Sequence, residues 1–228
     1  MSKAVVLFSG GQDSTTCLYW ARQSFDEVLA ASVFYGQRHR AELGAAADIA
    51  ALAGVRHIVL EAPVLGGFAD SALVDASLPL AGGGGRPDAA MPGGLPTSFV
   101  PGRNILFLAL AAALAVKEGA HDVVTGVCQT DYSGYPDCRR EFVDALEVAL
   151  RHGMPSSCGP LRILTPLMWM TKAETARLAR RLPGCWEALG RSLTCYEGRR
   201  PGCGVCAACE LRARGFAEAG EVDPAAAT

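Results

Sequence analysis

The sequence predicts an α/β fold in which helices cover both faces of a parallel sheet, followed by a small cysteine-rich subdomain at the C-terminus. Three observations predict it. Short apolar segments typical of strands alternate with longer segments of helical periodicity. The first apolar segment, residues 4–8, runs directly into Gly10 and Gly11, as in a strand, a tight turn and a helix. Four of the nine cysteines lie between residues 195 and 209.

Length, composition and charge exclude several classes of protein. The 228 residues suit one domain with a small appendage, and a hydrophobic content of 50% excludes a chain that is disordered as a whole. The formal net charge is −2 and no block of Lys or Arg occurs, which argues against nucleic acid or an anionic membrane as a partner. We expect small polar substrates, no nucleic-acid partner and no membrane contact.

The N-terminal part contains three predicted strands and two predicted helices. The first strand, 4–8, is followed by a helix at 14–24, a strand at 28–36 and a second helix that leads to a strand at 55–60. The apolar stripe of the second helix contains Leu43, Ala46, Ala47, Ala50 and Ala53. Strands that alternate with helices in this way are typical of a parallel sheet. The apolar segment at the N-terminus is too short for the core of a signal peptide, so we expect a cytoplasmic protein.

Residues 62–102 interrupt this pattern. They contain the sequence AGGGGRPDAAMPGGLP, and a long segment without regular structure inside a compact domain is usually a functional lid or a disordered insert. We expect a flexible insert here.

Regular elements return after the insert. Residues 105–116 predict a helix buried on most sides, and they are too few to span a membrane. A fourth strand is expected at 121–128, an amphipathic helix at 138–153, and a short strand or extended segment at 162–170. The next residues, TKAE, predict a helix that begins with a capping box.

The turn after the first strand is a candidate phosphate site. In the sequence FSGGQDSTTCL, Gly10 and Gly11 allow close approach of a ligand to backbone N–H groups, while Ser9 and Ser14 add hydroxyl donors. Asp13 could hold Mg²⁺ or brace the loop. Neither a Gly-Lys pair of the usual nucleotide-binding loop nor the dinucleotide motif G-x-G-x-x-G is present. The alternative interpretation is a simple tight turn between strand and helix.

The cysteine cluster predicts a metal site. Cys195, Cys203, Cys206 and Cys209 follow the spacing C-x7-C-x2-C-x2-C, which can surround one tetrahedral Zn²⁺. Four thiolates leave no open position on the metal, so this zinc would be structural. An iron–sulfur cluster is the alternative, but its usual motif would need a further cysteine at position 213, where Ala213 stands.

Three cations are expected near the phosphate site. Arg103 and Lys172 each follow the predicted start of a helix, where a positive charge opposes the helix dipole and a nearby anion would compensate it. Arg38 follows the second strand and would lie over a bound nucleotide. A solvent-exposed helix start is an equally good interpretation of Arg38.

The sequence GVCQTDYSGYPDCRREF follows the fourth strand and is rich in polar and aromatic residues. Asp131 or Asp137 could accept the paired N–H donors of a guanine-like edge, and Tyr132 or Tyr135 could stack on the ring. The alternative is an ordinary Asp-Ser-Gly-Pro turn.

Six blocks resemble a known family. The blocks VVLFSGGQDSTTCL, YGQRHRAE, FVPGRNILFL, TGVCQTDYSGYPDCR, TPLMWMTKAET and LTCYEG with CGVCAACELRARGF occur in the order found in the 7-cyano-7-deazaguanine synthase family, also called QueC. The resemblance extends from Lys3 to Phe216. The string SGGQDS is similar to the PP-loop of ATP pyrophosphatases, which holds the pyrophosphate of ATP while the α-phosphate is attacked.

The resemblance implies a fold, a reaction and a site. The fold would be a PP-loop sandwich of the adenine nucleotide alpha hydrolase type, with an ATP-binding catalytic domain at 1–185, a zinc-binding region at 186–216 and a disordered tail at 217–228. The reaction would convert 7-carboxy-7-deazaguanine and ammonia to 7-cyano-7-deazaguanine and consume ATP. It would pass through an adenylated acid and an adenylated amide and would belong to queuosine biosynthesis. Zinc, Mg²⁺ and a homodimer are implied as well. The implied catalytic residues are Asp13, Ser14, Arg103 and Lys172. The implied ATP-binding residues are Phe8, Ser9, Gly10, Gly11, Gln12, Asp13, Ser14, Thr15, Thr16, Cys17 and Leu18.

Two other functions stay open at this point. One is a PP-loop enzyme that modifies tRNA, such as a sulfur transferase, although the net charge argues against a basic surface. The other is a zinc-ribbon interaction module with a vestigial loop. The chain also departs from the family at Gln129, where Glu is common, which leaves in doubt any role for a negative charge there.

Overall fold

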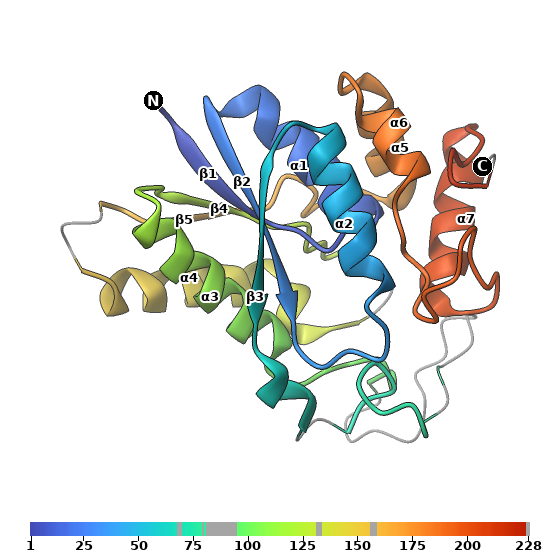
Figure 1. Cartoon of the computed structure of the whole chain (residues 1–228), viewed down its shortest axis with the longest axis horizontal. Coiled ribbons are helices and arrows are strands. Elements are labelled where there is room, and N and C mark those ends of the chain that lie inside the picture. Colours follow the sequence, from blue (N-terminus) through green and yellow to red (C-terminus); the bar gives the residue numbers. More distant parts are fainter. Residues whose placement is uncertain (68–69, 79, 81–94, 131–133, 156–158, 227–228) are drawn as a thin grey trace.

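A computed structural model describes residues 1–67, 70–78, 80, 95–130, 134–155 and 159–226. Within them the sheet has five strands in the order β3-β2-β1-β4-β5, and all neighbouring strands are parallel. The strands are β1 (Lys3–Leu7), β2 (Glu27–Phe34), β3 (Arg56–Glu61), β4 (Asp122–Val124) and β5 (Arg162–Leu164). The predicted parallel α/β sheet is confirmed (Figure 1).

Helices cover both faces of the sheet. One layer contains α1 (Gln12–Ser24), α2 (Ala41–Leu52), α5 (Lys172–Arg181), α6 (Cys185–Gly190) and α7 (Ala207–Ala219), and the other contains α3 (Arg103–Lys117) and α4 (Arg140–Gly153) (Figure 1). Two short 3-10 helices, Pro63–Gly67 and Pro136–Cys138, lie in the connections. No helix in these described ranges is long and apolar enough to cross a membrane.

Strand β1 lies at the centre of the sheet and contributes to both hydrophobic layers. Ala4 and Val6, followed by Phe8, pack in the cluster with α1, α2 and α5, whereas Val5 packs in the cluster with α3 and α4. Because successive side chains of a strand point to opposite faces, a continuous apolar run is what a strand buried on both faces requires.

Several predicted elements differ at their ends. Helix α1 begins at Gln12, two residues before the predicted start, and β4 ends at Val124 rather than at residue 128. On α2 the predicted stripe is wrong at Ala47, which is exposed, while Ala45 and Ile49 are buried. In a helix so rich in alanine, hydrophobicity differs little between faces, so the sequence alone places the stripe poorly.

The described parts of residues 62–102 are packed, which differs from the expected flexible insert. Leu65, Leu73 and Val100 belong to one hydrophobic cluster, and Ser71 Oγ donates a hydrogen bond to the carbonyl of Thr97 at 2.9 Å. This segment therefore covers the carboxyl end of β2. Residues 81–94, which hold the Gly-rich stretch, lie outside the described residues.

Disorder is expected at 217–228, and the described part of this tail, residues 217–226, is packed, whereas residues 227 and 228 lie outside the described residues. Helix α7 continues to Ala219, and Asp223 accepts two hydrogen bonds from Arg212, at 2.6 and 2.8 Å. Ala225 is buried at 7% exposure. An ion pair that involves an almost fully buried guanidinium holds this segment against the domain, and the composition AEAGEVDPAAAT alone did not reveal it.

Candidate active site and metal centre

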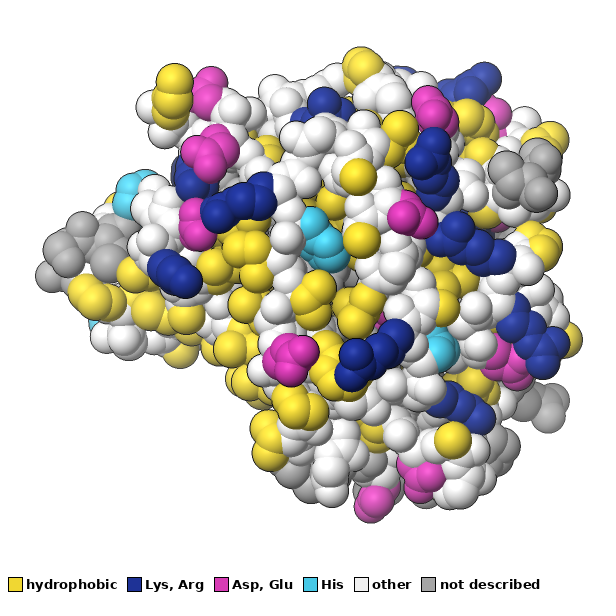
Figure 2. Space-filling view, in the orientation of Figure 1, with side chains coloured by type: hydrophobic (Ala, Val, Ile, Leu, Met, Phe, Trp, Pro, Cys, Tyr) yellow, Lys and Arg dark blue, Asp and Glu magenta, His cyan; other side chains and the backbone are white. Residues whose placement is uncertain are grey.

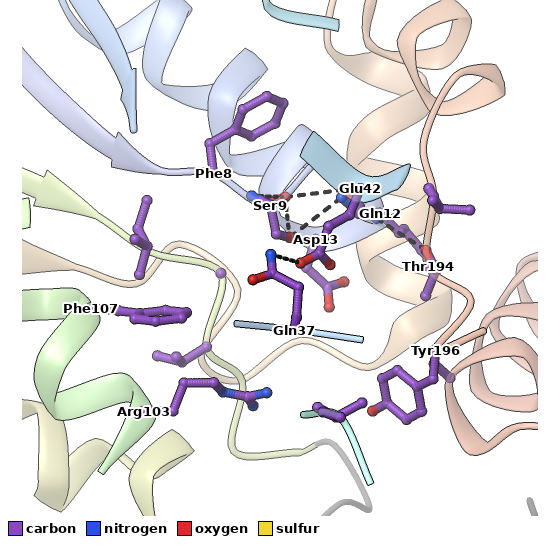
Figure 3. A pocket seen from close by; sticks show the side chains of 18 of the residues that line it. Phe8, Ser9, Gln12, Asp13, Gln37, Glu42, Arg103, Phe107, Thr194 and Tyr196 are labelled. Carbon is purple, nitrogen blue, oxygen red and sulfur yellow. Dashed lines mark hydrogen bonds between the residues drawn. The ribbon is translucent and has the colours of Figure 1, made fainter. Parts of the chain in front are cut away.

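A cavity of about 330 Å³ lies at the carboxyl ends of β1 and β4. The chain passes from β1 outward to β2 and β3 and later adds β4 and β5 on the other side, so strand order reverses between β1 and β4. Open α/β sheets bind ligands at such a point. The segment after β4 lies close to the start of α1, because a Cβ atom on Gly126 would lie 3.2 Å from the Cβ of Asp13. Residues 9–14, the candidate phosphate site, are called the phosphate loop below. Figure 3 shows Ser9, Gln12 and Asp13 of this loop on one side of the cavity and Arg103 of α3 on another.

Residues 8–11 form the tight turn between β1 and α1. The N–H of Ser9 donates to Ser14 Oγ at 3.2 Å, and the hydroxyls of the two serines lie 3.1 Å apart. Helix α1 begins after Gly11, which caps it without a side-chain hydrogen bond. The partial positive charge of this helix end therefore faces the cavity, where it favours an anion.

Two polar atoms of the loop are buried without a hydrogen-bond partner among the described residues, Gln12 Nε2 and Asp13 Oδ1. Gln12 is 2% exposed and lines the cavity. A buried donor or acceptor without a partner costs about 1–3 kcal/mol, so these atoms fit a site that a ligand completes. An amide N–H suits a phosphate oxygen, and a carboxylate oxygen suits Mg²⁺.

Asp13 and Lys172 come together although 158 residues separate them in the chain. Lys172 Nζ lies 2.6 Å from Asp13 Oδ2. Lys172 is the first residue of α5, and the predicted capping box is confirmed: Thr171 accepts from the Glu174 N–H and Glu174 accepts from the Thr171 N–H. The cap fixes the start of α5, and the Asp13 carboxylate is the anion that compensates a lysine placed there.

Arg103 begins α3 and also has a nearby anion. Burial alone would lower the pKa of Arg103, but the surrounding tyrosine hydroxyls and the Asp137 carboxylate raise it above its usual value. The Asp137 carboxylate accepts the N–H of Asn104 at 3.4 Å. Burial raises the pKa of Asp137, and Arg103 and this N–H oppose the rise. Asp137 therefore stabilises the start of α3 and is not among the described residues that line the cavity.

The block YGQRHRAE supplies a pair of residues that sequence reasoning missed. Gln37 Nε2 donates to Glu42 Oε1 at 2.7 Å, and both side chains line the cavity. Burial raises the pKa of Glu42, and the Gln37 hydrogen bond opposes that rise. Arg38, the residue that the sequence singled out, also lines the cavity but donates to the carbonyls of Ala72 and Ala76. The one signal for this pair in the sequence is that Gln37 lies in the loop just before α2 and Glu42 lies in its first turn.

The other predicted residues divide into two groups. Phe8, Ser9, Gly11, Gln12, Asp13, Ser14, Arg38, Arg103, Tyr135 and Lys172 all line the cavity. Gly10 and residues 15–18 do not line it, and residues 15–18 are fully buried. A helix presents only its first turn to a ligand at its N-terminus, so the cavity lining supports the part of the predicted ATP site before residue 15 and leaves residues 15–18 as a prediction. Asp131 and Tyr132 lie outside the described residues.

Gln129 has a structural partner. Its side-chain oxygen accepts the N–H of Arg140, the first residue of α4, at 3.0 Å. An amide oxygen can cap a helix as a carboxylate does. The departure from Glu at this position therefore keeps the hydrogen bond.

Substitution of Gly10 by alanine tests whether the loop has room for a side chain at this position. The φ of Gly10 is +78°, and a Cβ would lie 2.7 Å from the backbone nitrogen of Ala46 in α2. We expect Gly10→Ala to lower the free energy of unfolding by about 3 kcal/mol, the sum of backbone strain and overpacking. Urea titration measures this loss.

Gly54 is the matched control for Gly10. It has φ +64°, and a Cβ added to it would meet nothing within 4 Å, so Gly54→Ala should cost only about 1 kcal/mol of strain. Equal losses in the two variants would contradict the close contact between the loop and α2.

The four cysteines of the predicted metal site lie together. The Sγ atoms of Cys195, Cys203, Cys206 and Cys209 are all within 4.8 Å of one another, and those of Cys203 and Cys209 are 3.9 Å apart. Sulfurs around a tetrahedral zinc with bonds of about 2.3 Å lie about 3.8 Å apart.

The pKa values differ between thiols of the cluster, because burial raises those of Cys206 and Cys209. Burial would raise the pKa of Cys203, but the N–H groups of Val205 and Cys206 lower it to about 7. Gly202 allows the approach of Cys209, whose Sγ would lie 3.1 Å from a Cβ at that position. Four soft ligands in a closed cluster fit a structural metal such as zinc.

Known proteins are similar in sequence to this chain over nearly its whole length. The family described as "Queuosine biosynthesis protein QueC" matches residues 3–220. The 7-cyano-7-deazaguanine synthase of Chromobacterium violaceum is 55% identical over 224 residues, which cover 97% of this chain and 92% of that protein. The proteins of the same name from Laribacter hongkongensis and Lysinibacillus sphaericus are 52% and 46% identical and cover 97% and 95% of this chain, and 93% and 94% of their own length.

Solved structures support the fold. A predicted subunit of a tRNA methyltransferase from Methanocaldococcus jannaschii has a TM-score of 0.51 at 17% identity and covers 79% of this chain and 75% of its own. A 4-thiouridine synthetase, in a complex with RNA and ATP, has a TM-score of 0.50 at 13% identity and covers 96% of this chain and 50% of its own. At such identities the likeness concerns the fold alone. From the family match and the full-length relatives, the chain is an enzyme and belongs to the QueC family of queuosine biosynthesis proteins.

Proposed function

We propose that this enzyme is a nitrile-forming carbon–nitrogen ligase that converts 7-carboxy-7-deazaguanine and ammonia into 7-cyano-7-deazaguanine with ATP. The name of its relatives and the family support the product and the pathway. The observation that carries the use of ATP is the turn at residues 9–14, where the N-terminus of α1 and the Gln12 side-chain amide, which has no partner among the described residues, face one cavity together with Lys172.

ATP would lie with its two outer phosphates against residues 9–14. The side-chain amide of Gln12, the hydroxyl of Ser9 and the N–H groups of Asp13 and Ser14 in the first turn of α1 offer hydrogen bonds to phosphate oxygens. Asp13 Oδ1, which has no partner among the described residues, fits Mg²⁺. When bound, the ion would neutralise charge on the phosphates. The Lys172 ammonium, 2.6 Å from Asp13 Oδ2, stabilises charge on the same side.

The reaction needs two activations. An oxygen of the substrate carboxylate attacks the α-phosphorus, pyrophosphate leaves, and an acyl adenylate forms. Ammonia then adds to the acyl carbon and AMP leaves, which gives the amide after loss of a proton. The amide oxygen attacks a second ATP, pyrophosphate leaves again, and loss of AMP and a proton gives the nitrile. The protein contributes orientation and charge stabilisation in each half.

The deazapurine would occupy the part of the cavity toward α3. Arg103 and Tyr135 line it there, and Tyr35 and Phe107 form an aromatic pair with centroids 5.2 Å apart. Arg103 could bind the substrate carboxylate, and the tyrosines offer aromatic faces for stacking. Asp131 remains a proposed contact to the edge of the ring, and Tyr132 remains a proposed stacking partner for its face.

We also propose that the protein is a homodimer, that it is located in the cytoplasm and that it does not bind nucleic acid. The homodimer rests on the family resemblance, and sedimentation velocity would test it. The cytoplasmic location is supported by the eight cysteines that the structure describes, because none of them forms a disulfide. On the face that Figure 2 shows, basic side chains lie among acidic and uncharged ones, and the formal net charge of the chain is −2, which supports small substrates over nucleic acid.

Product analysis tests the function. We expect the purified protein to form AMP and pyrophosphate from ATP only when both 7-carboxy-7-deazaguanine and ammonia are present, with two AMP released for each nitrile. Chromatography of the nucleotides and mass spectrometry of the base measure both. Formation of ADP would contradict the proposed role of the loop, and AMP formation that depends on tRNA instead of the acid would favour a tRNA-modifying enzyme.

A further inference from the structure

The segment that leads into the metal site forms one wall of the phosphate loop. The N–H of Leu193 donates to the carbonyl of Gly10 at 2.9 Å, and Thr194 Oγ1 accepts the N–H of Gln12, the first residue of α1, at 3.3 Å. The next residue is the cysteine ligand Cys195. Thr194 also lines the cavity, although nothing in the sequence pattern of the loop points to it.

Arg212 of α7 also lines the cavity and holds Ser192 and Thr194 in place. It is 6% exposed. Its Nη1 donates to Thr194 Oγ1 at 2.9 Å and to Ser192 Oγ at 2.7 Å, and the Asp223 carboxylate accepts from Nε and Nη2. Because all three guanidinium nitrogens of Arg212 donate hydrogen bonds, the orientation of the guanidinium is fixed, and so is the position of Thr194 Oγ1.

The hydrogen bonds of Thr194 determine where its proton points. A backbone N–H and an arginine can only donate, so Thr194 Oγ1 accepts both bonds and uses both lone pairs. The hydroxyl proton has no acceptor in the described part of the chain. It is therefore available to a ligand in the cavity that Thr194 lines. Next to a helix N-terminus that favours anions, the acceptor would be a phosphate oxygen.

The next turn of α7 sets the position of Lys172. A Cβ on Gly215 would lie 2.4 Å from the Cβ of Lys172 and 3.1 Å from its carbonyl carbon. Helices α7 and α5 can approach this closely only because residue 215 has no side chain. Gly215 thus fixes the backbone from which Lys172 reaches Asp13.

We propose that Thr194 is a phosphate-binding residue of the ATP site, held in its donor state by Arg212, and that Gly215 is a positioning residue for Lys172. Helix α7, whose N-terminal turn carries Cys209, thereby supports both sides of the phosphate site. This inference rests on the proposed use of ATP. By this inference, Thr194 and α7, which lie next to the cysteine cluster, take part in substrate binding as well as in folding.

Isothermal titration with ATP tests the role of Thr194. Thr194→Val keeps the shape but removes the donor and the shared acceptor, and we expect the Kd for ATP to rise about tenfold to hundredfold. Thr194→Ser keeps the hydroxyl and should stay within about threefold of the parent protein. Both variants should retain the metal content of the parent, measured by mass spectrometry. A purely structural role would lower the melting temperature without changing the Kd of the folded protein.

The outcomes separate this inference from the proposed function. If the parent protein binds ATP and Thr194→Val binds it equally well, the role of Thr194 is overturned while the proposed function stands. If the parent protein does not bind ATP at all, the proposed function fails, and this inference fails with it.

Gly215→Ala tests the second half of the inference. The added methyl displaces Lys172, and we expect kcat for AMP formation to fall at least about tenfold. Gly44→Ala, also on a helix but with nothing within 4 Å of the added Cβ, is the matched control and should leave kcat unchanged. Equal kcat values in the two variants would overturn the role of Gly215.

Discussion

Replacement of Lys172 by methionine is expected to lower kcat for AMP formation by about 10²–10³-fold, the usual loss when one preorganised group that stabilises transition-state charge is removed. The side chain keeps its length but loses the ammonium 2.6 Å from Asp13 Oδ2. Asp13 would then stand without its cation beside the phosphates and would repel them. Steady-state assays of AMP at saturating acid and ammonia measure the effect.

The exposed Lys117 provides the control for this prediction. It lies at the end of α3, and Lys117→Met should leave kcat unchanged. Lys172→Arg is expected to recover little activity, because a planar guanidinium cannot replace a compact ammonium on a capped helix start. A Lys172→Met variant with the kcat of the parent enzyme would show that this lysine does not take part in the reaction.

Replacement of Cys206 by alanine is expected to abolish metal binding and to lower stability by several kcal/mol. Three remaining thiolates leave the tetrahedral set incomplete, and the free energy of metal binding is lost from the folded state. Cys206 also precedes α7, the helix that carries Arg212 and Gly215. ATP binding should therefore weaken together with metal binding. Metal analysis, thermal unfolding and ATP titration measure the three effects.

Cys17 is the matched control because it is a fully buried cysteine in the hydrophobic cluster around α1. Cys17→Ala should cost about 1 kcal/mol, as expected for a small loss of buried volume, and should keep one metal ion per chain. If Cys206→Ala retained a full equivalent of metal and the stability of the parent, the four-cysteine site would be refuted.

The sequence predicted the features that local patterns determine. The apolar run of β1 is recognisable because both faces of a central parallel strand are buried. The turn Ser9–Ser14, the capping box at Thr171 and the cysteine spacing also depend on residues close together in the chain. The structure places each of these features where the sequence predicted it.

The features that it missed depend on contacts between distant segments. The sequence offered Asp131 or Asp137 as a contact to a purine edge, and the structure shows the Asp137 carboxylate at the N–H of Asn104 in the first turn of α3. Thr194 and Gly215 lie in the last of the six blocks, but the sequence assigns them no role, and their significance follows from distances to Gln12 and Lys172. Side-chain orientation and close helix approach are set by packing, and a single sequence does not encode them as a local signal.

The central claim is that the turn between β1 and α1 holds the two outer phosphates of ATP. A crystal structure with Mg²⁺ and an ATP analogue that cannot be cleaved between the α- and β-phosphates tests it most directly. The account predicts the β- and γ-phosphates within hydrogen-bond distance of residues 9–14, of the Gln12 amide and of Thr194 Oγ1, with the α-phosphate open to the side lined by Arg103. Phosphates bound elsewhere in the cavity, with the turn free, would contradict it.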